Sequence, residues 1–211
     1  MNTFIDKAMG MALAVIAAAS ILGGCAAPQA AYVPPPLGAS WTTLQRNTGS
    51  YGSGEARVEV SRGETAWEGR TVMTFKTAQG TTLADPALGN LIALLAPDGK
   101  LVARMEPPHG FEWPLTIGKE WTSHYTMINA AGGRVPVTSS CKVASREDIT
   151  IKAGTFKTIL VHCNNSLGQN DSLWFAPDVG LFVKTNLRRT ANHAAGAGTR
   201  DMELVTKVSG R

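Results

Sequence analysis

Short runs in which apolar and polar residues alternate predict strands through most of the chain. Residues 56–61 (ARVEVS) alternate with a period of two, which places Val58 and Val60 on one face of a strand. Residues 65–77 are rich in Thr, Val, Trp and Phe, which favour strands. Glycines cluster before the first of these runs, as expected for a turn. This part of the chain therefore predicts antiparallel strands joined by turns.

The segment 85–96 (DPALGNLIALLA) fits two structures. Its leucines and isoleucine are spaced as on one side of a helix, and its aspartate and proline could begin one. However, its end, LLAPD at 94–98, matches WFAPD at 174–178, where the aromatic residues favour a strand before a Pro-Asp turn. The prediction is a hairpin of strands 90–96 and 100–105, with a short helical turn at 86–89 as the alternative for its start.

The second half of the chain is also rich in β-forming residues. The expected strands lie near 119–128, 134–146, 149–152, 155–164, 171–176 and 180–187. Residues 188–200 are small and polar, so we expect a loop there, followed by a closing strand at 201–208.

Several landmarks recur at an offset of about 80 residues, which is a signature of tandem repeats. The matches are GxxWT at 38–42 and 118–122, TFKT at 74–77 and 155–158, and APD at 96–98 and 176–178. They predict repeat one at 38–109 and repeat two at 118–190. Trp41 and Trp121 would then occupy equivalent positions.

These patterns predict an all-β chain of two tandem antiparallel meanders of about 80 residues each. A sheet with one apolar face must cover that face. The two meanders could pack as a sandwich, or close into a strongly curved sheet or barrel. In either case we expect one β domain over residues 38–211.

The N-terminus has the features of an export signal over residues 1–24. Lys7 supplies positive charge, and an apolar stretch at 8–22 is too short to span a bilayer. The string LGGC, ending at Cys25, resembles the lipobox of bacterial lipoproteins. That resemblance implies that Cys25 carries acyl chains such as palmitate and becomes the mature N-terminus. The absence of Asp at Ala26 implies sorting to the outer membrane, on its periplasmic face.

Residues 25–37 would form the lipid anchor and a proline-rich tether. They show no apolar periodicity, and three consecutive prolines stiffen them into an extended spacer. We expect the folded domain to begin near Gly38.

The run from Glu147 to Phe182 resembles a pattern found in uncharacterised exported bacterial β-domains. In that pattern a strand, a turn of small residues and a Thr-Phe strand precede an aromatic hairpin that turns at a proline. The residues that carry the resemblance are turn glycines, core aromatics and a proline. It supports a β fold and implies no catalytic residue.

Two cysteines remain after Cys25, namely Cys141 and Cys163, and export would place them in an oxidising compartment. The turn-like Lys152-Ala153-Gly154 lies midway between them, which suits facing positions on adjacent antiparallel strands. They lack CxxC spacing and a nearby group of histidines, so a redox or metal-binding pair is disfavoured. We therefore predict a structural disulfide between Cys141 and Cys163.

No catalytic motif is recognisable, and the four histidines lack metal-ligand spacing, so we expect neither a catalytic residue nor a metal or other cofactor. Asp171 and Asp178 flank an expected hairpin, where acidic residues commonly serve turns. Among the five tryptophans, Trp113 is the best candidate for a ligand contact, although core packing explains it more readily. No specific ligand-binding residue can be assigned.

The expected function is that of a non-enzymatic binding or scaffold module anchored in the cell envelope. A carrier for an apolar ligand in a half-barrel pocket is an alternative, and an envelope hydrolase is a third. The net charge of +4 is too small and scattered to favour nucleic acid as a partner. The expected partners are the membrane, through Cys25, and another envelope protein or a glycan.

Overall fold

The computed structural model describes residues 29–210, and the predicted all-β class is confirmed there. The strands are β1 Ser40–Gly49, β2 Gly54–Trp67, β3 Arg70–Thr77, β4 Gly80–Ala84, β5 Leu91–Leu95, β6 Leu101–His109, β7 Glu120–Asn129, β8 Arg134–Ile151, β9 Gly154–Asn165, β10 Gln169–Ala176, β11 Leu181–Arg189 and β12 Gly198–Leu204. None of the described residues forms a helix long and apolar enough to cross a membrane.

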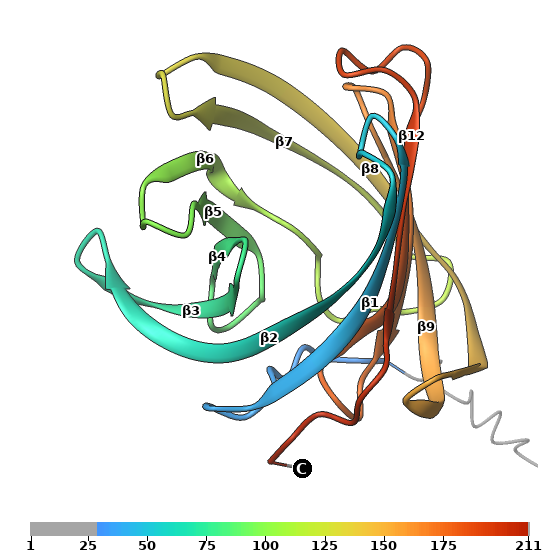
Figure 1. Cartoon of the computed structure of the whole chain (residues 1–211). Helices are drawn as coiled ribbons and strands as arrows, with labels where there is room; N and C mark the ends of the chain where they lie inside the picture. Colours follow the sequence, from blue (N-terminus) through green and yellow to red (C-terminus); the bar gives the residue numbers. More distant parts are fainter. Residues whose placement is uncertain (1–28, 211) are drawn as a thin grey trace, which may run out of the picture.

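Each strand pairs antiparallel with its neighbour in sequence, and β1 also pairs with β12, so the sheet closes as a barrel (Figure 1). The closing ladder joins residues 43–49 of β1 to residues 198–204 of β12. Most connections are short turns, which can join only adjacent antiparallel strands. Of the arrangements that the sequence allowed, the structure therefore has the barrel. Closure pairs strand edges that would otherwise remain free.

Alternate strands run in opposite directions, which defines two ends of the barrel. We call the end at which β1 begins the base, and the end at which β1 finishes the mouth. Odd-numbered strands therefore run from base to mouth and even-numbered strands run back. The connections β7–β8, β9–β10 and β11–β12 lie at the mouth, and β8–β9 and β10–β11 lie at the base (Figure 1).

The structure does not show the predicted tandem repeat. The offset of about 80 residues does relate β1 to β7 and β6 to β11. However, four strands lie between β1 and β6, whereas three lie between β7 and β11. The additional strand reverses the direction of everything after it, so the two Pro-Asp turns lie at opposite ends of the barrel. Trp41 and Trp121 nevertheless each occupy the second position of a strand, and both are buried.

Several strand boundaries differ from the sequence-based expectation. The predicted strands 134–146 and 149–152 form one continuous strand, β8, with a bulge between Val143 and Ser145. The closing strand is β12, which starts and ends earlier than the predicted 201–208. Beyond it, the Val205 amide donates to the Thr42 carbonyl, and Val208 is buried. The bulge in β8 keeps this long strand paired while the strand bends around the barrel.

The base of the barrel is filled by two segments that are not strands. The link between β6 and β7 (residues 110–119) and the N-terminal residues 30–37 meet at an isolated bridge between Ala30 and Leu115. Leu115 and Pro35 are fully buried. The residues from Ala30 onward, expected to belong to a free spacer, therefore pack against the barrel. The cluster that they complete also contains Trp121, Cys141, Val143, Ile159, Val161 and Phe175.

The predicted disulfide is present. Cys141 on β8 lies directly opposite Cys163 on β9, and their Cα atoms are 4.1 Å apart. The two cysteines lie on either side of the Lys152–Gly154 turn, at equal distances in sequence from Lys152, as predicted. It therefore ties together the two longest neighbouring strands of the wall.

Replacing both Cys141 and Cys163 with Ala should reduce the free energy of unfolding by about 3 kcal/mol, because the 22-residue loop is no longer closed in the unfolded chain. Urea unfolding without reductant measures the difference. Wild-type protein unfolded with reductant is the control and should approach the value of the variant. Equal stability of the oxidised wild type and the double variant would contradict a stabilising bridge.

Candidate functional site

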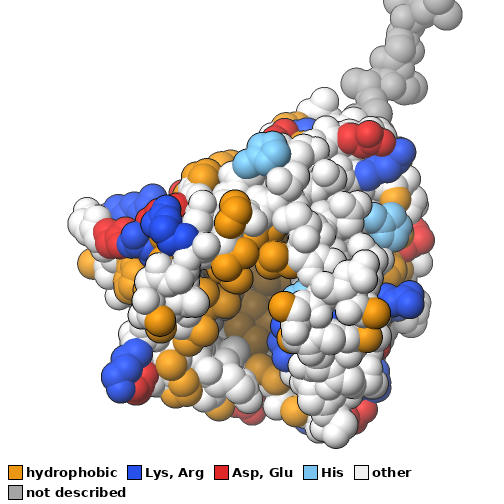
Figure 2. All heavy atoms as spheres, turned by 90° about the horizontal axis from the view of Figure 1, so that it is seen from above, with side chains coloured by type: hydrophobic (Ala, Val, Ile, Leu, Met, Phe, Trp, Pro, Cys, Tyr) orange, Lys and Arg blue, Asp and Glu red, His pale blue; other side chains and the backbone are white. Residues whose placement is uncertain are grey.

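The interior of the barrel is hollow toward the mouth. Figure 2, which looks from above, shows a deep hollow with mostly hydrophobic walls and basic and histidine side chains along one side. The aromatic cluster at the base closes the other end. There the centroid of the Phe175 ring lies 4.8 Å from that of Trp113 and 5.4 Å from that of Phe182. The interior thus has an apolar lower part and a more polar upper part.

Between these two parts lies a cavity of about 250 Å³. It is lined by Leu91, Met105, His109, Gly110, Phe111, Tyr125, Ser139, Cys141, Cys163, Asn164, Asn165, Gln169, Asp171 and Leu173. Its walls come from β5 to β10 and the link after β6, so the curvature of the sheet is what gathers them around one space. Apolar walls with a few polar groups are typical of small-molecule sites.

Asp171 is the acidic residue of this cavity. Its Oδ2 accepts a hydrogen bond of 3.0 Å from Nε2 of Gln169. Its Oδ1 is buried and has no hydrogen-bond partner among the described residues. Burial raises the pKa of Asp171 from 3.8 to about 6, although the Gln169 hydrogen bond acts in the opposite direction. The carboxyl group therefore changes charge close to neutral pH.

Tyr51 connects this carboxylate to the mouth. It lies in the β1–β2 turn, and its hydroxyl donates to Oε1 of Gln169 at 2.9 Å. The guanidinium groups of Arg189 and Arg200 lie over the Tyr51 ring, 3.9 and 4.6 Å from its centroid. Burial lowers the pKa of Arg200. Nε of Arg189 is buried without a partner among the described residues, so this upper part also has unused hydrogen-bonding capacity.

His109 and Tyr125 form an aromatic wall of the cavity. Their rings stack with centroids 4.0 Å apart, and Nδ1 of His109 lies 3.3 Å from the Ser123 hydroxyl. Burial lowers the pKa of His109, which favours the uncharged imidazole at neutral pH. Burial also raises the pKa of Tyr125. The wall is therefore uncharged, whereas Asp171 supplies the titrating charge.

The cavity brings a histidine, a serine and a carboxylate from different strands together, but not as a proton relay. Asp171 hydrogen-bonds to Gln169, and no hydrogen bond to His109 is found among the described residues. A nucleophile-and-base arrangement would need the carboxylate to orient the imidazole. Within residues 29–210, no group of three or more His, Cys, Asp or Glu side chains is placed to hold a metal ion.

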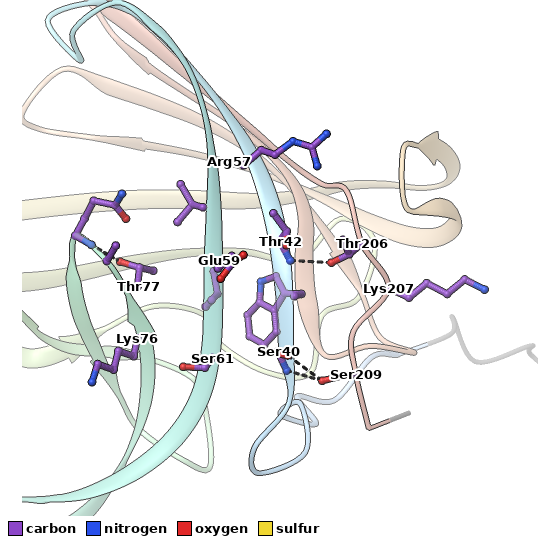
Figure 3. Close-up of a pocket in the computed structure, with 15 residues that line it drawn as sticks. Ser40, Thr42, Arg57, Glu59, Ser61, Lys76, Thr77, Thr206, Lys207 and Ser209 are labelled. Atoms are coloured by element: carbon purple, nitrogen blue, oxygen red, sulfur yellow. Dashed lines mark hydrogen bonds between the residues drawn. The ribbon is translucent and has the colours of Figure 1, made fainter.

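A larger groove of about 1000 Å³ runs along the outer edge of β2. It exists because β3 pairs with β2 only from Ser61 onward, which leaves the first half of β2 paired on one side. Figure 3 shows the groove between β2 and the turn that follows Thr77, with Arg57 and Lys207 pointing away from that turn. The groove is open, and none of its lining side chains has a buried polar atom without a partner among the described residues. The interior cavity is therefore the stronger candidate.

The other residues singled out from the sequence lie elsewhere. Nε1 of Trp113 donates to the Leu88 carbonyl at 2.8 Å, and its ring packs against Tyr32 and Phe175, as core packing requires. Cys25 and the signal at 1–24 lie outside the described residues. Of the histidines, only His109 lines the cavity. Cys141 and Cys163 line it as well, through their disulfide.

Sequence reasoning missed the role of Asp171. We expected it to serve a turn, but it lies within β10, in register with Cys163 of β9. The period of a strand contains the missing signal, because residues 171, 173 and 175 share one face and the last two are Leu and Phe. A carboxylate on an apolar face indicates a buried acid.

The chain was also compared with known proteins. No protein-family model matches it, and no curated protein matches it. Several solved structures are similar. Three of them are the hypothetical lipoprotein YmcC of Escherichia coli (13% identity, 81% of this chain and 88% of that chain covered, TM-score 0.44), a proposed lipoprotein of Parabacteroides distasonis (11%, 85% and 99%, 0.40), and a proposed exported protein with a YmcC-like fold from Bacteroides fragilis (13%, 85% and 99%, 0.45). Similarity at these TM-scores does not identify a function.

Asp171 should make the stability of the protein depend on pH. Because its pKa is raised in the folded state, its contribution is fully present below pH 4 and is lost as the pH rises to about 6. Asp171→Asn should remove this loss, so that the variant is more stable than wild type above pH 6 by up to about 3 kcal/mol. Urea unfolding from pH 4 to pH 8 measures the difference.

The matched control is Asp148→Asn, an exposed carboxylate on β8. It should retain the wild-type difference in stability between pH 4 and pH 8. If Asp171→Asn keeps that difference as well, the pH dependence arises from another group.

Proposed function

We propose that this protein is a non-enzymatic binding module of the bacterial cell envelope, lipid-anchored at Cys25 on the periplasmic face of the outer membrane. The ligand is a small, partly apolar molecule with a hydroxyl or amine donor, and it occupies the barrel cavity. Glycan fragments and other amphipathic compounds belong to this class. The observation that carries the proposal is the buried Oδ1 of Asp171, a residue that lines the cavity: no described residue donates a hydrogen bond to this oxygen.

An unsatisfied buried acceptor costs roughly 1–3 kcal/mol, and more when it carries charge. A ligand that donates a hydrogen bond to Oδ1 of Asp171 would recover that cost. The neighbouring His109–Tyr125 stack and Phe111 offer flat apolar surfaces to the rest of the ligand. The combination favours a molecule with one polar and one apolar part.

The cavity limits the size of what it can hold. Its volume of about 250 Å³ lies just below the usual range of about 300–1,000 Å³ for ligand pockets. A small molecule therefore fits, and so does the buried end of a longer one that leaves through the mouth. The apolar side chains Leu91, Met105 and Leu173 complete the lining.

The proposed cellular location rests on the sequence. Lys7, the short apolar stretch and the LGGC string indicate export and acylation, and Ala26 favours the outer membrane. Two or more acyl chains are enough for stable anchoring. Ala30 lies at the base, so an anchored barrel would direct its mouth away from the bilayer. Ligand exchange would then take place with the periplasm.

Leu91→Trp should block the cavity. The test uses the mature chain from Ala26 without acyl chains and N-phenyl-1-naphthylamine, whose ring system and N–H match the proposed class. Wild type should increase the dye fluorescence. Leu91→Trp should bind at least about tenfold more weakly, a change of about 1.4 kcal/mol.

The control is Val102→Trp, which adds the same ring at an exposed position near the mouth. It should bind the dye as wild type does. Urea midpoints show whether each variant is folded, and Asp171→Asn offers a second route, because it removes the charged acceptor. Dye binding that neither cavity variant weakens would disprove the proposed site.

Cys25→Ser tests the anchor. Without a thiol to acylate, the protein should leave the membrane fraction and appear as soluble or uncleaved protein. Cell fractionation followed by intact-mass measurement checks both the location and the acyl chains. Unchanged membrane fractionation with normal signal cleavage would rule out the proposed lipidation.

A further inference from the structure

We propose that the base of the barrel docks onto the lipid surface, with Val33, Leu37, Leu88 and Ile117 inserted into the interface. This inference rests on the proposed anchor at Cys25 and adds an interaction surface to it. The acyl chains would hold the protein at the membrane, and the base would fix its orientation there.

The length of the chain between Cys25 and Ala30 limits how far the base can lie from the bilayer. Among the described residues, the first backbone bridge to the barrel is at Ala30, whose amide donates to the Leu115 carbonyl at 3.0 Å and whose carbonyl accepts from the Leu115 amide at 2.8 Å. Five residue steps separate Cys25 from Ala30, and they span at most about 18 Å when fully extended. The base is therefore the part of the barrel nearest the membrane.

The exposed apolar side chains gather at this same end. Six large hydrophobic residues are exposed in the described chain, and four of them lie in the segments that close the base. The four are Val33, Leu37, Leu88 and Ile117, which are 54%, 66%, 44% and 48% exposed. The other two, Val102 and Val135, lie near the mouth. A random scatter of exposed side chains would need no explanation. Here, however, the exposed side chains gather at the end of the barrel to which the segment from Cys25 to Ala30 leads.

These four residues belong to segments that contact one another. The loop containing Leu88 accepts a hydrogen bond from Trp113, which lies in the same link as Ile117. Gly89, in the loop that contains Leu88, lies so close to Tyr32 that a Cβ atom added there would be 2.6 Å from the Tyr32 ring. Gly180, in the β10–β11 connection, also lies against the N-terminal segment, because an added Cβ atom would be 2.0 Å from the Val33 carbonyl oxygen. The N-terminal residues, the loop at 85–90 and the link at 110–119 therefore form one continuous plate.

The plate presents these side chains from a fixed backbone. Oδ1 of Asp85 accepts hydrogen bonds of 2.9 Å from the amides of both Ala87 and Leu88, which holds the tip of that loop. Leu37 lies in a turn closed by a hydrogen bond from the Ala39 amide to the Pro36 carbonyl, and the next amide, Gly38, donates to Arg62. Aliphatic side chains on ordered loops can enter the interface without further ordering of the backbone.

The partner of this plate is therefore a lipid surface, because the short segment from Cys25 to Ala30 already places the bilayer beside the plate. Apolar burial contributes in proportion to the area removed from water. Four separate aliphatic side chains give a weak contact that could not hold the protein alone. It is sufficient to choose among the orientations that the anchor allows.

The experiment uses the full acylated chain with one added cysteine. Cys141 and Cys163 are bridged, and acylated Cys25 has no free thiol, so an added thiol can be labelled selectively. Leu37→Cys, Leu88→Cys and Ile117→Cys each receive a nitrobenzoxadiazole dye. The proteins are placed in phosphatidylethanolamine and phosphatidylglycerol vesicles that contain nitroxide lipid. The labels at the base should shift to the blue and lose most of their fluorescence.

Val102→Cys and Val135→Cys are the matched controls, because these positions are exposed near the mouth. Their labels should keep their fluorescence. In a Leu37→Ser, Ile117→Ser background the label at Leu88 should regain fluorescence, whereas Val102→Ser with Val135→Ser should leave it quenched. Protein that floats with the vesicles but shows equal quenching at both ends would overturn the docking alone. Protein that does not float would overturn the anchor and the docking together.

Discussion

The interior of a twelve-stranded barrel is wider than the inward-facing side chains of its own strands can fill. An eight-stranded barrel has an interior just wide enough for its side chains, and the diameter grows with the number of strands. Here the base is filled by two segments from outside the wall, joined at Ala30 and Leu115. They supply Tyr32, Phe111 and Trp113 to a cluster that also contains Phe175 and Phe182. No segment within residues 29–210 fills the mouth in the same way.

This unequal filling gives the two ends different chemistry. At the base, the aromatic cluster excludes water. Toward the mouth, the inward positions bear Gln169 and the arginines that flank Tyr51. Asp171 lies between the two regions, close enough to the apolar cluster for burial to raise its pKa to about 6. The unpaired Oδ1 is therefore a consequence of where the filling stops.

The same filling connects the N-terminal segment from Ala30 onward to the interior cavity. Tyr32 lies against Trp113 and its hydroxyl is 3.9 Å from the sulfur of Met73, so the N-terminal segment is part of the core. Phe111 links this cluster to the cavity, because it packs on Phe182 and lines the cavity as well. The position of the N-terminal segment at the base and that of the cavity above it are therefore two consequences of the same packing.

Local patterns in the sequence determined the strands, most of the turns and the disulfide. The alternation at 56–61 marks part of β2, and the Pro-Asp turns mark the β5–β6 and β10–β11 hairpins. Cys141 and Cys163 were predictable because a hairpin register depends on its turn, and Lys152–Gly154 is nearby in sequence. These features depend on interactions between residues that are close along the chain or face each other across one turn. Such interactions leave a readable trace in residue type and spacing.

Only the tertiary structure decided closure, strand direction and the cavity. The pairing of β1 with β12 joins residues that are distant in the sequence, from Thr43 with Leu204 to Gly49 with Gly198, and no local pattern encodes it. The short strand β4 reverses all later strands, so an apparent repeat with matching landmarks became two unlike halves. Asp171 seemed a turn residue until β9 and β11 enclosed it. The physical reason is that burial, and with it the pKa and the unmet hydrogen bond, depends on distant segments that the closed barrel brings together.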